Sequence, residues 1–183
     1  RVSRRQRQMC IRDSIDPVLI LELIEKEKIR SSLFVPAVIL FLVSIPQAAE
    51  TDFSSLKFVL YGASPIADDT ILKAKEIMKC DLFQVYGLTE TAGAITILMP
   101  EDHDPEKGKL RSCGKALNSV EIKVVDDEGN EVKTGDIGEV ISKSPLNMKG
   151  YWNRPDATEE AIKDGWFYSG DAGFFDDEGY LYI

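Results

Sequence analysis

Blocks of apolar and polar residues divide the start of the chain into short helices and strands. Asp16-Pro17 is a typical N-cap and first-turn pair, so it predicts a helix that runs to about residue 29. Apolar residues lie along one face of that helix. Pro36 then separates a predicted buried strand, 32–35, from an apolar helix, 37–44.

The same alternation continues toward the middle of the chain. Buried strands are predicted at 56–61 and 82–85. The helix between them ends near Lys79, and Asp68 or Asp69 is expected to cap it. Alternating strands and helices favour a parallel sheet whose faces are covered by helices.

After Pro100 the pattern changes to a charged loop, 101–109, and then to short alternating segments. These segments predict strands separated by turns, at 120–125, 137–143, 166–168 and 180–183. We therefore expect an α/β part over 15–104 and a small β-rich subdomain, a distorted barrel, over 105–183, with the boundary near Pro105.

Two acidic segments share one pattern, Asp126-Asp127-Glu128-Gly129 and Asp176-Asp177-Glu178-Gly179. Calcium loops are one interpretation, but neither segment has the alternating ligands and distal glutamate of an EF-hand. Hairpin turns in which glycine takes positive φ explain both segments better.

Charge is distributed unevenly along the 183 residues, whose net charge is -9. Residues 1–14 carry five arginines and one aspartate, whereas 15–183 carry 17 basic and 30 acidic side chains. The acidic body disfavours nonspecific nucleic-acid binding. The arginine-rich leader is either a transit peptide or a foreign segment, and we expect it to be disordered and without function.

Cysteine usage and hydropathy indicate a cytoplasmic protein. Cys10, Cys80 and Cys113 are too few and too far apart for a disulfide framework, so free thiols in a reducing compartment are expected. The most apolar segment, Leu33–Ile45, is interrupted by Pro36 and is too short to span a bilayer.

Chemically useful residues gather in the segment from Gln84 to Thr91. Its position predicts a loop at the carboxyl end of a strand, where α/β sheets place ligands, with a helix beginning after it. Tyr86 offers an aromatic face, Thr89 a hydroxyl and Glu90 a carboxylate, which together suit a purine ring, a phosphate oxygen and a magnesium ion. The alternative is purely structural: Thr89 as a helix N-cap and Glu90 as a first-turn acid.

Two further segments add parts that the first one lacks. Gly62-Ala63-Ser64-Pro65 is a turn of small residues that a flat ring can approach closely. Tyr168-Ser169-Gly170-Asp171 supplies a carboxylate suited to a pair of ribose hydroxyls. Each segment, taken alone, is equally explained as an ordinary turn.

The three segments in this order resemble the adenylate-forming, or AMP-binding, enzymes, which include acyl-CoA synthetases, luciferases and peptide-synthetase adenylation domains. The resemblance runs from about Asp16 to Ile183. Met148–Pro155 is most similar to the fatty-acyl-CoA synthetase branch, and we interpret it as a packed surface turn rather than a stacking platform for nucleic acid.

The resemblance implies roles for the residues of the first segment. Tyr86 would stack on adenine, Thr89 would contact the α-phosphate, and Glu90 would hold magnesium. Gly87 and Leu88 would belong to the same nucleotide loop.

The other segments complete the implied site. Gly62, Ala63 and Ser64 would lie along the other side of adenine, and Asp171 would bind the ribose hydroxyls. Gly93 and Ala94 would line the acyl pocket, where their small size leaves room for a bulky chain.

The implied reaction activates a carboxylic acid with Mg-ATP and transfers it to CoA. The similarity to the fatty-acyl-CoA synthetase branch implies that this acid is a fatty acid. Other acceptors, as in luciferase-like or peptide-synthetase proteins, and a noncatalytic nucleotide-binding module are the alternatives. Peripheral membrane contact is compatible with the sequence. The family's phosphate-binding loop, hinge and C-terminal lid are not recognised in these residues, so we expect an internal fragment that is inactive alone.

His103 is the one histidine of the chain and lies among Glu101, Asp102 and Asp104. A metal site would need further His or Cys ligands. We therefore expect His103 to lie in a solvated loop.

Overall fold

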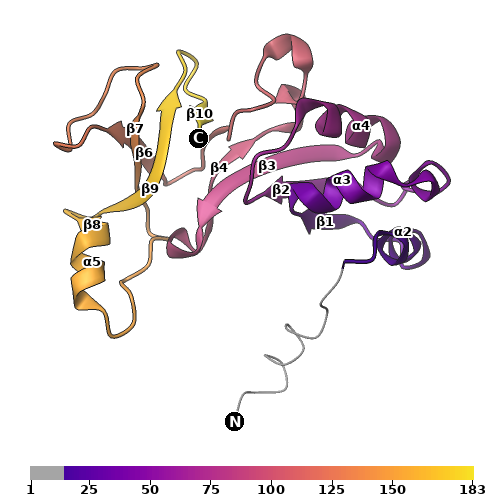
Figure 1. Ribbon diagram of the computed structural model, residues 1–183, viewed down its shortest axis with the longest axis horizontal. Helices are drawn as coiled ribbons and strands as arrows, with labels where there is room; N and C mark the ends of the chain where they lie inside the picture. Colours follow the sequence, from indigo (N-terminus) through magenta and orange to yellow (C-terminus); the bar gives the residue numbers. More distant parts are fainter. Residues whose placement is uncertain (1–14) are drawn as a thin grey trace.

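The computed structural model describes residues 15–183, which form an α/β half and a β-rich half (Figure 1). The leader expected at 1–14 lies outside the described residues. The α/β half contains α2 (Pro17–Lys26), β1 (Ser31–Phe34), α3 (Pro36–Ser44), the 3₁₀-helix η1 (Pro46–Ala49), β2 (Phe58–Gly62), α4 (Asp68–Met78), β3 (Asp81–Leu88), η2 (Thr89–Thr91), β4 (Gly93–Leu98), η3 (Pro100–Asp102), η4 (Pro105–Lys107) and β5 (Lys115–Ala116). The β-rich half contains β6 (Glu121–Val125), β7 (Gly138–Lys143), α5 (Pro155–Ala161), β8 (Ile162–Lys163), β9 (Trp166–Phe175) and β10 (Leu181–Tyr182).

The first sheet has the strand order β1-β2-β3-β4-β5 and is only partly parallel. Strands β1, β2 and β3 run parallel, as predicted, whereas β4 pairs antiparallel with β3 and β5 pairs antiparallel with β4. The prediction of a helix after residue 91 is therefore wrong. A hairpin forms instead, because the apolar, β-branched run of β4 extends the sheet.

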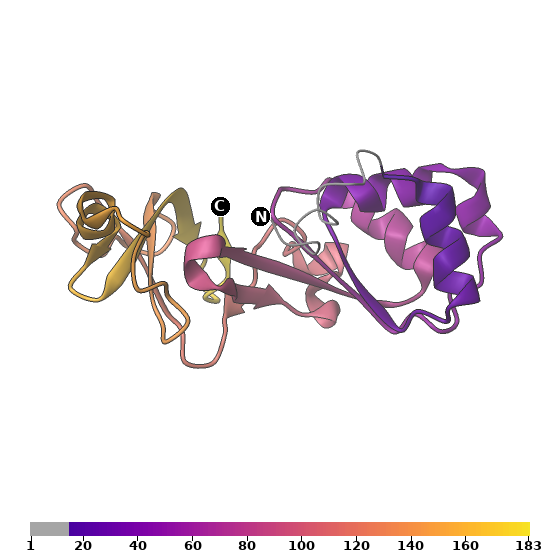
Figure 2. The ribbon, with the colours of Figure 1, turned by 90° about the horizontal axis from the view of Figure 1, so that it is seen from below.

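Helices cover one face of this sheet. Figure 2 shows α2, α3 and α4 on the same side, where the core packs Leu42, Val59, Tyr61 and Ile71. On the other face Leu33 is 66% exposed. The expectation that helices cover both faces therefore does not hold within residues 15–183.

Helix starts follow two different patterns. Asp16 caps α2 as predicted, since its carboxylate accepts hydrogen bonds from the backbone N–H of Val18 and Leu19. At α4 the N-cap is Ala67, which makes no side-chain cap. Asp68 and Asp69 instead lie in the first turn, where the helix dipole favours negative charge.

The second sheet has the order β10-β9-β7-β6, with β8 added to β9. Both predicted acidic turns are present: Asp126 and Asp176 accept backbone hydrogen bonds, and Gly129 and Gly179 take positive φ. Sequence patterning missed α5, a short helix that begins at Pro155.

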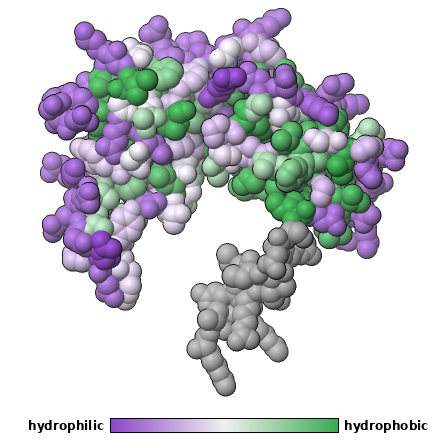
Figure 3. Space-filling view, in the orientation of Figure 1, coloured by the Kyte–Doolittle hydropathy of each residue, from purple (hydrophilic) through white to green (hydrophobic). Residues whose placement is uncertain are grey.

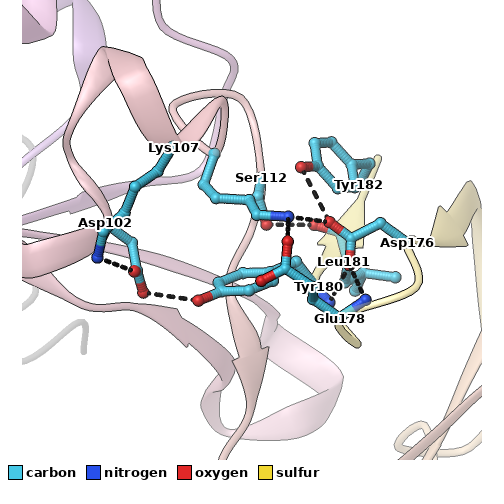
Figure 4. Close-up of polar contacts among 9 residues, drawn as sticks. Asp102, Lys107, Ser112, Asp176, Glu178, Tyr180, Leu181 and Tyr182 are labelled. Atoms are coloured by element: carbon cyan, nitrogen blue, oxygen red, sulfur yellow. Dashed lines mark hydrogen bonds and ion pairs between the residues drawn. The ribbon is translucent and has the colours of Figure 1, made fainter.

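A polar network ties the two halves together (Figure 4). Lys109 Nζ lies 2.7 Å from Asp176 Oδ2 and 2.6 Å from Glu178 Oε1, and the Tyr180 phenol donates to Asp102 Oδ2 at 3.0 Å. Because Lys109 and Asp102 precede the second sheet while their partners follow β9, the network fixes one half against the other. The boundary predicted near residue 105 stays a prediction, although β5 still belongs to the first sheet.

Backbone bonds strengthen the same junction. Leu181 of β10 donates its N–H to Gly114 O and accepts from Cys113 N at 2.7 Å, while it also pairs with Phe175 of β9. The Ser112 hydroxyl donates to Leu181 O at 3.0 Å. Leu181 thereby connects the second sheet to the residues that lead into β5.

His103 is buried, with 0% exposure, so the expected solvated loop is wrong. Tyr61 OH and His103 Nε2 are 2.9 Å apart, and His103 Nδ1 lies 2.8 Å from Met99 O. The carbonyl can only accept, so Nδ1 carries the proton and Nε2 accepts from the phenol. Burial lowers the pKa of the His103 imidazole, and the neutral ring is a satisfied part of the core.

None of the helices in residues 15–183 is long and apolar enough to cross a membrane. Cys80 and Cys113 are free thiols, as predicted. Burial raises the pKa of each thiol to about 11, so both are protonated at neutral pH.

Candidate nucleotide site

Two of the predicted segments meet through Tyr86 and Asp171. The Tyr86 phenol donates a hydrogen bond to Asp171 Oδ2 at 2.7 Å, although the residues are 85 positions apart. Both side chains are half-buried. Burial, and then the hydrogen bond to Asp171, raise the pKa of the Tyr86 phenol, so it stays a neutral donor. An aromatic face and a carboxylate therefore share one site.

The tip of the β3–β4 hairpin carries the expected phosphate and metal groups. In Figure 1 this tip lies between the two halves, and Figure 3, in the same orientation, shows hydrophobic residues gathered on the α/β half. Thr89 is exposed and Glu90 half-buried in η2. The hydroxyl of Thr91 shapes the tip, because it accepts from Leu88 N at 2.9 Å and lies 2.7 Å from Gly93 O.

The Gly62–Ser64 turn leaves β2 beside the strand that carries Tyr86. Gly62 pairs with Val85 of β3, and a Cβ at Gly62 would lie 2.1 Å from Val85 O. This strand contact requires glycine irrespective of any ligand. Ala63 has φ +70° and, like Ser64, is exposed. Both are therefore accessible beside β3.

Strand pairing also explains the small residues that follow. Leu88 lies opposite Gly93 and Gly87 opposite Ala94. A Cβ at Gly87 would lie 1.9 Å from Gly93 O, whereas a Cβ at Gly93 would meet nothing within 4 Å. Gly87 is therefore needed for hairpin closure, and Gly93 faces open space next to the hairpin tip.

Two residues that sequence reasoning did not assign belong to this region. Gln84 is 8% exposed, its Oε1 has no partner, and it lines a pocket of about 390 Å³ with residues 65–67, 110, 111 and 183. Its amide in an otherwise apolar strand segment was the available signal. Tyr151 donates its phenol hydrogen to Glu90 Oε1 at 2.9 Å, a contact that no local pattern reveals.

The carboxylates of this region do not form a preassembled cage. Residues 15–183 contain no group of three or more His, Cys, Asp or Glu side chains placed to hold a metal ion. Glu90 Oε2 makes no hydrogen bond with any described residue, so it is available as an oxygen ligand. This fits Mg²⁺, which one or two carboxylates commonly hold together with substrate phosphates.

Comparison with known proteins places the chain in a family. The sequence model described as AMP-binding enzyme matches residues 5–152. The chain belongs to the AMP-binding enzyme family. The match begins at residue 5, within the segment 1–14 that was expected to be a leader.

Curated relatives of this AMP-binding chain include fatty-acid ligases. It is 36% identical over 163 residues to the fatty acid–[acyl-carrier-protein] ligase ScoC of Streptomyces coeruleorubidus, covering 89% of this chain and 31% of ScoC. It is 35% identical over 176 residues to the medium/long-chain-fatty-acid–CoA ligase FadD8 of Mycobacterium tuberculosis, covering 96% of this chain and 30% of FadD8. The chain thus spans less than a third of each relative.

A solved structure supports the same fold. O-succinylbenzoate coenzyme A synthetase from Bacillus subtilis, in complex with AMP, superposes with a TM-score of 0.81 at 32% identity. The superposition covers 94% of this chain and 34% of that one. The predicted fold class, an α/β part followed by a β-rich part, is confirmed.

Proposed function

We propose that this chain is the AMP-binding region of an ATP-dependent acid–thiol ligase that activates a fatty acid and transfers it to CoA. The observation that carries the proposal is the 2.7 Å contact between Tyr86 and Asp171, which joins two sequence segments at one site. Family membership and the two fatty-acid ligases among the relatives support it.

Residue roles follow from chemistry at the site. The Tyr86 ring would stack on adenine, and Asp171 would accept hydrogen bonds from the ribose hydroxyls, because its Oδ1 is not engaged by Tyr86. Thr89 would contact the α-phosphate. Glu90 would hold Mg²⁺ through Oε2, and the metal when bound would neutralise phosphate charge.

The small residues would shape the surrounding walls. Gly62, Ala63 and Ser64 would lie along the second face of adenine. Gly93 and Ala94 would line the acyl pocket, which the open space beside Gly93 supports.

The proposed chemistry has two balanced steps. A carboxylate oxygen of the acid bonds to the α-phosphorus of ATP while the bond to pyrophosphate breaks, giving an acyl-adenylate. The CoA thiol then loses its proton and bonds to the acyl carbon while AMP leaves. We propose that this chemistry takes place in the cytoplasm, with peripheral membrane contact during delivery of the acid.

The acceptor of the acyl group has a specific alternative to CoA. ScoC is named as an acyl-carrier-protein ligase, and it matches this chain as well as FadD8 does. Acyl transfer to a carrier protein is therefore the second candidate function.

Isothermal titration of the chain with AMP and with Mg-ATP tests the nucleotide site. Asp171→Asn should weaken AMP binding about 10-fold to 150-fold, since hydrogen bonds to charged groups contribute about 1.5–3 kcal/mol. Binding of 2′,3′-dideoxy-AMP should be equally weak in both proteins. Asp177→Asn, in an exposed turn, is the matched control.

Equal loss of AMP and dideoxy-AMP affinity would contradict the ribose assignment. Absence of any nucleotide binding by the wild-type chain would overturn the proposed function.

A further inference from the structure

Glu90 is held at two points by the segment that follows β7. The backbone N–H of Met148 donates to Glu90 O at 2.6 Å, and the Tyr151 phenol donates to Glu90 Oε1 at 2.9 Å. Tyr151 and Glu90 are 61 positions apart and belong to different halves of the molecule. The carboxylate proposed to hold magnesium is therefore oriented by a residue of the β-rich half.

The segment that carries Tyr151 is itself braced against α5. The Tyr151 backbone N–H donates to Thr158 Oγ1 at 2.9 Å, and that hydroxyl donates to Arg154 O at 2.8 Å. Gly150 has φ +148°, and a Cβ there would lie 2.7 Å from Thr158 Cγ2. Close packing and hydrogen bonding together fix where the phenol points.

The contact selects one orientation of a group that is otherwise free to rotate. The terminal torsion of glutamate is broad and roughly two-fold, so a carboxylate without a partner samples many orientations. A phenol on Oε1 leaves Oε2 as the oxygen for a cation. Neighbouring Trp152, by contrast, is 91% exposed, so the aromatic segment is not simply a packed turn.

We propose that Tyr151 is a positioning residue that orients the Glu90 carboxylate for Mg²⁺. This inference rests on the proposed function, because that function assigns the metal to Glu90. It adds that the metal ligand on the first sheet is aligned from the β-rich half, through the brace at Thr158.

The first test needs neither nucleotide nor metal. The chain has six tyrosines, so 3-fluorotyrosine labelling gives a small set of ¹⁹F resonances, and Tyr151→Phe identifies the one from Tyr151. Glu90→Ala should shift that resonance. An unmoved resonance would show that the contact is absent in solution and would overturn the inference whatever the nucleotide does.

The second test separates positioning from mere packing. Tyr151→Phe should raise the Mg²⁺ concentration for half-maximal ATP binding about 10-fold, the usual lower range for loss of a group that orients a metal ligand. Binding of AMP without Mg²⁺ should not change. Tyr180→Phe is the matched control, since it removes a phenol–carboxylate bond at the junction, 3.0 Å to Asp102.

The outcomes distinguish the two proposals. If Glu90→Ala alters the Mg²⁺ dependence and Tyr151→Phe does not, Tyr151 has no positioning role and the function stands. If Tyr151→Phe weakens metal-free AMP binding equally, its role is structural and the inference is overturned. If Glu90→Ala leaves the Mg²⁺ dependence intact, or the wild-type chain binds no nucleotide, the functional assignment fails and this inference fails with it.

Discussion

Replacing His103 by leucine tests whether the imidazole is the buried link between β2 and the loop after β4. Both His103 and Tyr61 have 0% exposure. His103→Leu would leave the buried Tyr61 hydroxyl without a partner, whereas the Met99 carbonyl keeps the hydrogen bond from Asp102 N at 3.0 Å. A buried hydroxyl without a partner costs about 1–3 kcal/mol, so the variant should lose about 1–3 kcal/mol of unfolding free energy. That is a large part of the roughly 5–15 kcal/mol that a folded domain has.

Urea unfolding, followed by circular dichroism, measures this loss. Adding Tyr61→Phe to His103→Leu removes the orphaned hydroxyl, so the double variant should recover part of the stability, with a coupling of about 0.5–3 kcal/mol. A solvated histidine predicts the opposite result, because exposed substitutions usually stay within about 0.5 kcal/mol. A change that small would refute the assignment of His103 to the core.

Acid should expose the same residue through its linkage to folding. Burial lowers the pKa of His103 in the folded chain, whereas in the unfolded chain the imidazole takes up a proton as pH falls through about 6.5. The unfolded state then binds more protons, so this contribution to stability is fully present above that pH and declines below it. Unfolding midpoints measured from pH 7.5 to 5 should show this decline in the wild type and less of it in His103→Leu; equal slopes would contradict the linkage.

Three further substitutions test other parts of the fold by urea unfolding. Gly62→Ala should cost about 1–3 kcal/mol of unfolding free energy, because the added Cβ would lie 2.1 Å from Val85 O. Ala63→Gly should instead be neutral or gain up to about 1 kcal/mol, because glycine relieves the strain of φ +70°. Equal effects of the two substitutions would contradict the strand contact at Gly62. Thr91→Val should cost about 1–3 kcal/mol, since Leu88 N loses its partner. In a chain labelled with 3-fluorotyrosine, the same substitution should also move the ¹⁹F resonance of Tyr86. An unmoved resonance would count against the role of Thr91 in shaping the hairpin tip. Lys109→Met should lower the urea midpoint more than Lys107→Met, because Lys109 contacts two carboxylates with 11% of its side chain exposed, whereas Lys107 contacts one with 45% exposed; the reverse order would remove the junction role.

Local patterns predicted the elements whose signals lie within a few residues. The Asp16 cap, the strand–helix alternation and the acidic hairpin turns all depend on short-range geometry, and the structure confirms them. The family resemblance implies that Tyr86 and Asp171 belong to one nucleotide site; their side chains are in contact, at 2.7 Å, and their nucleotide roles stay a prediction.

What the sequence did not reveal depends on long-range pairing. The segment after Thr91 forms a strand because β3 offers it an edge, and His103 is buried because Tyr61 offers it a hydrogen bond from 42 positions away. The acids around His103 indicated a hydrated loop, yet Asp102 is drawn toward Tyr180 and is only 9% exposed. The pattern around Tyr151 predicts only a surface turn, because its partner, Glu90, is 61 positions away and lies in the other half.

The bond between Ser112 and Leu181 spans 69 positions, and this has a bearing on biosynthesis. During translation the helical layer can collapse as soon as its own strands emerge, while the residues that join it to the second sheet are still inside the ribosome. We expect nascent chains stalled before residue 181 to be protected from protease over α2–α4 but cleaved around 112–114. Protection of both regions at that stage would show that the two halves join without β10.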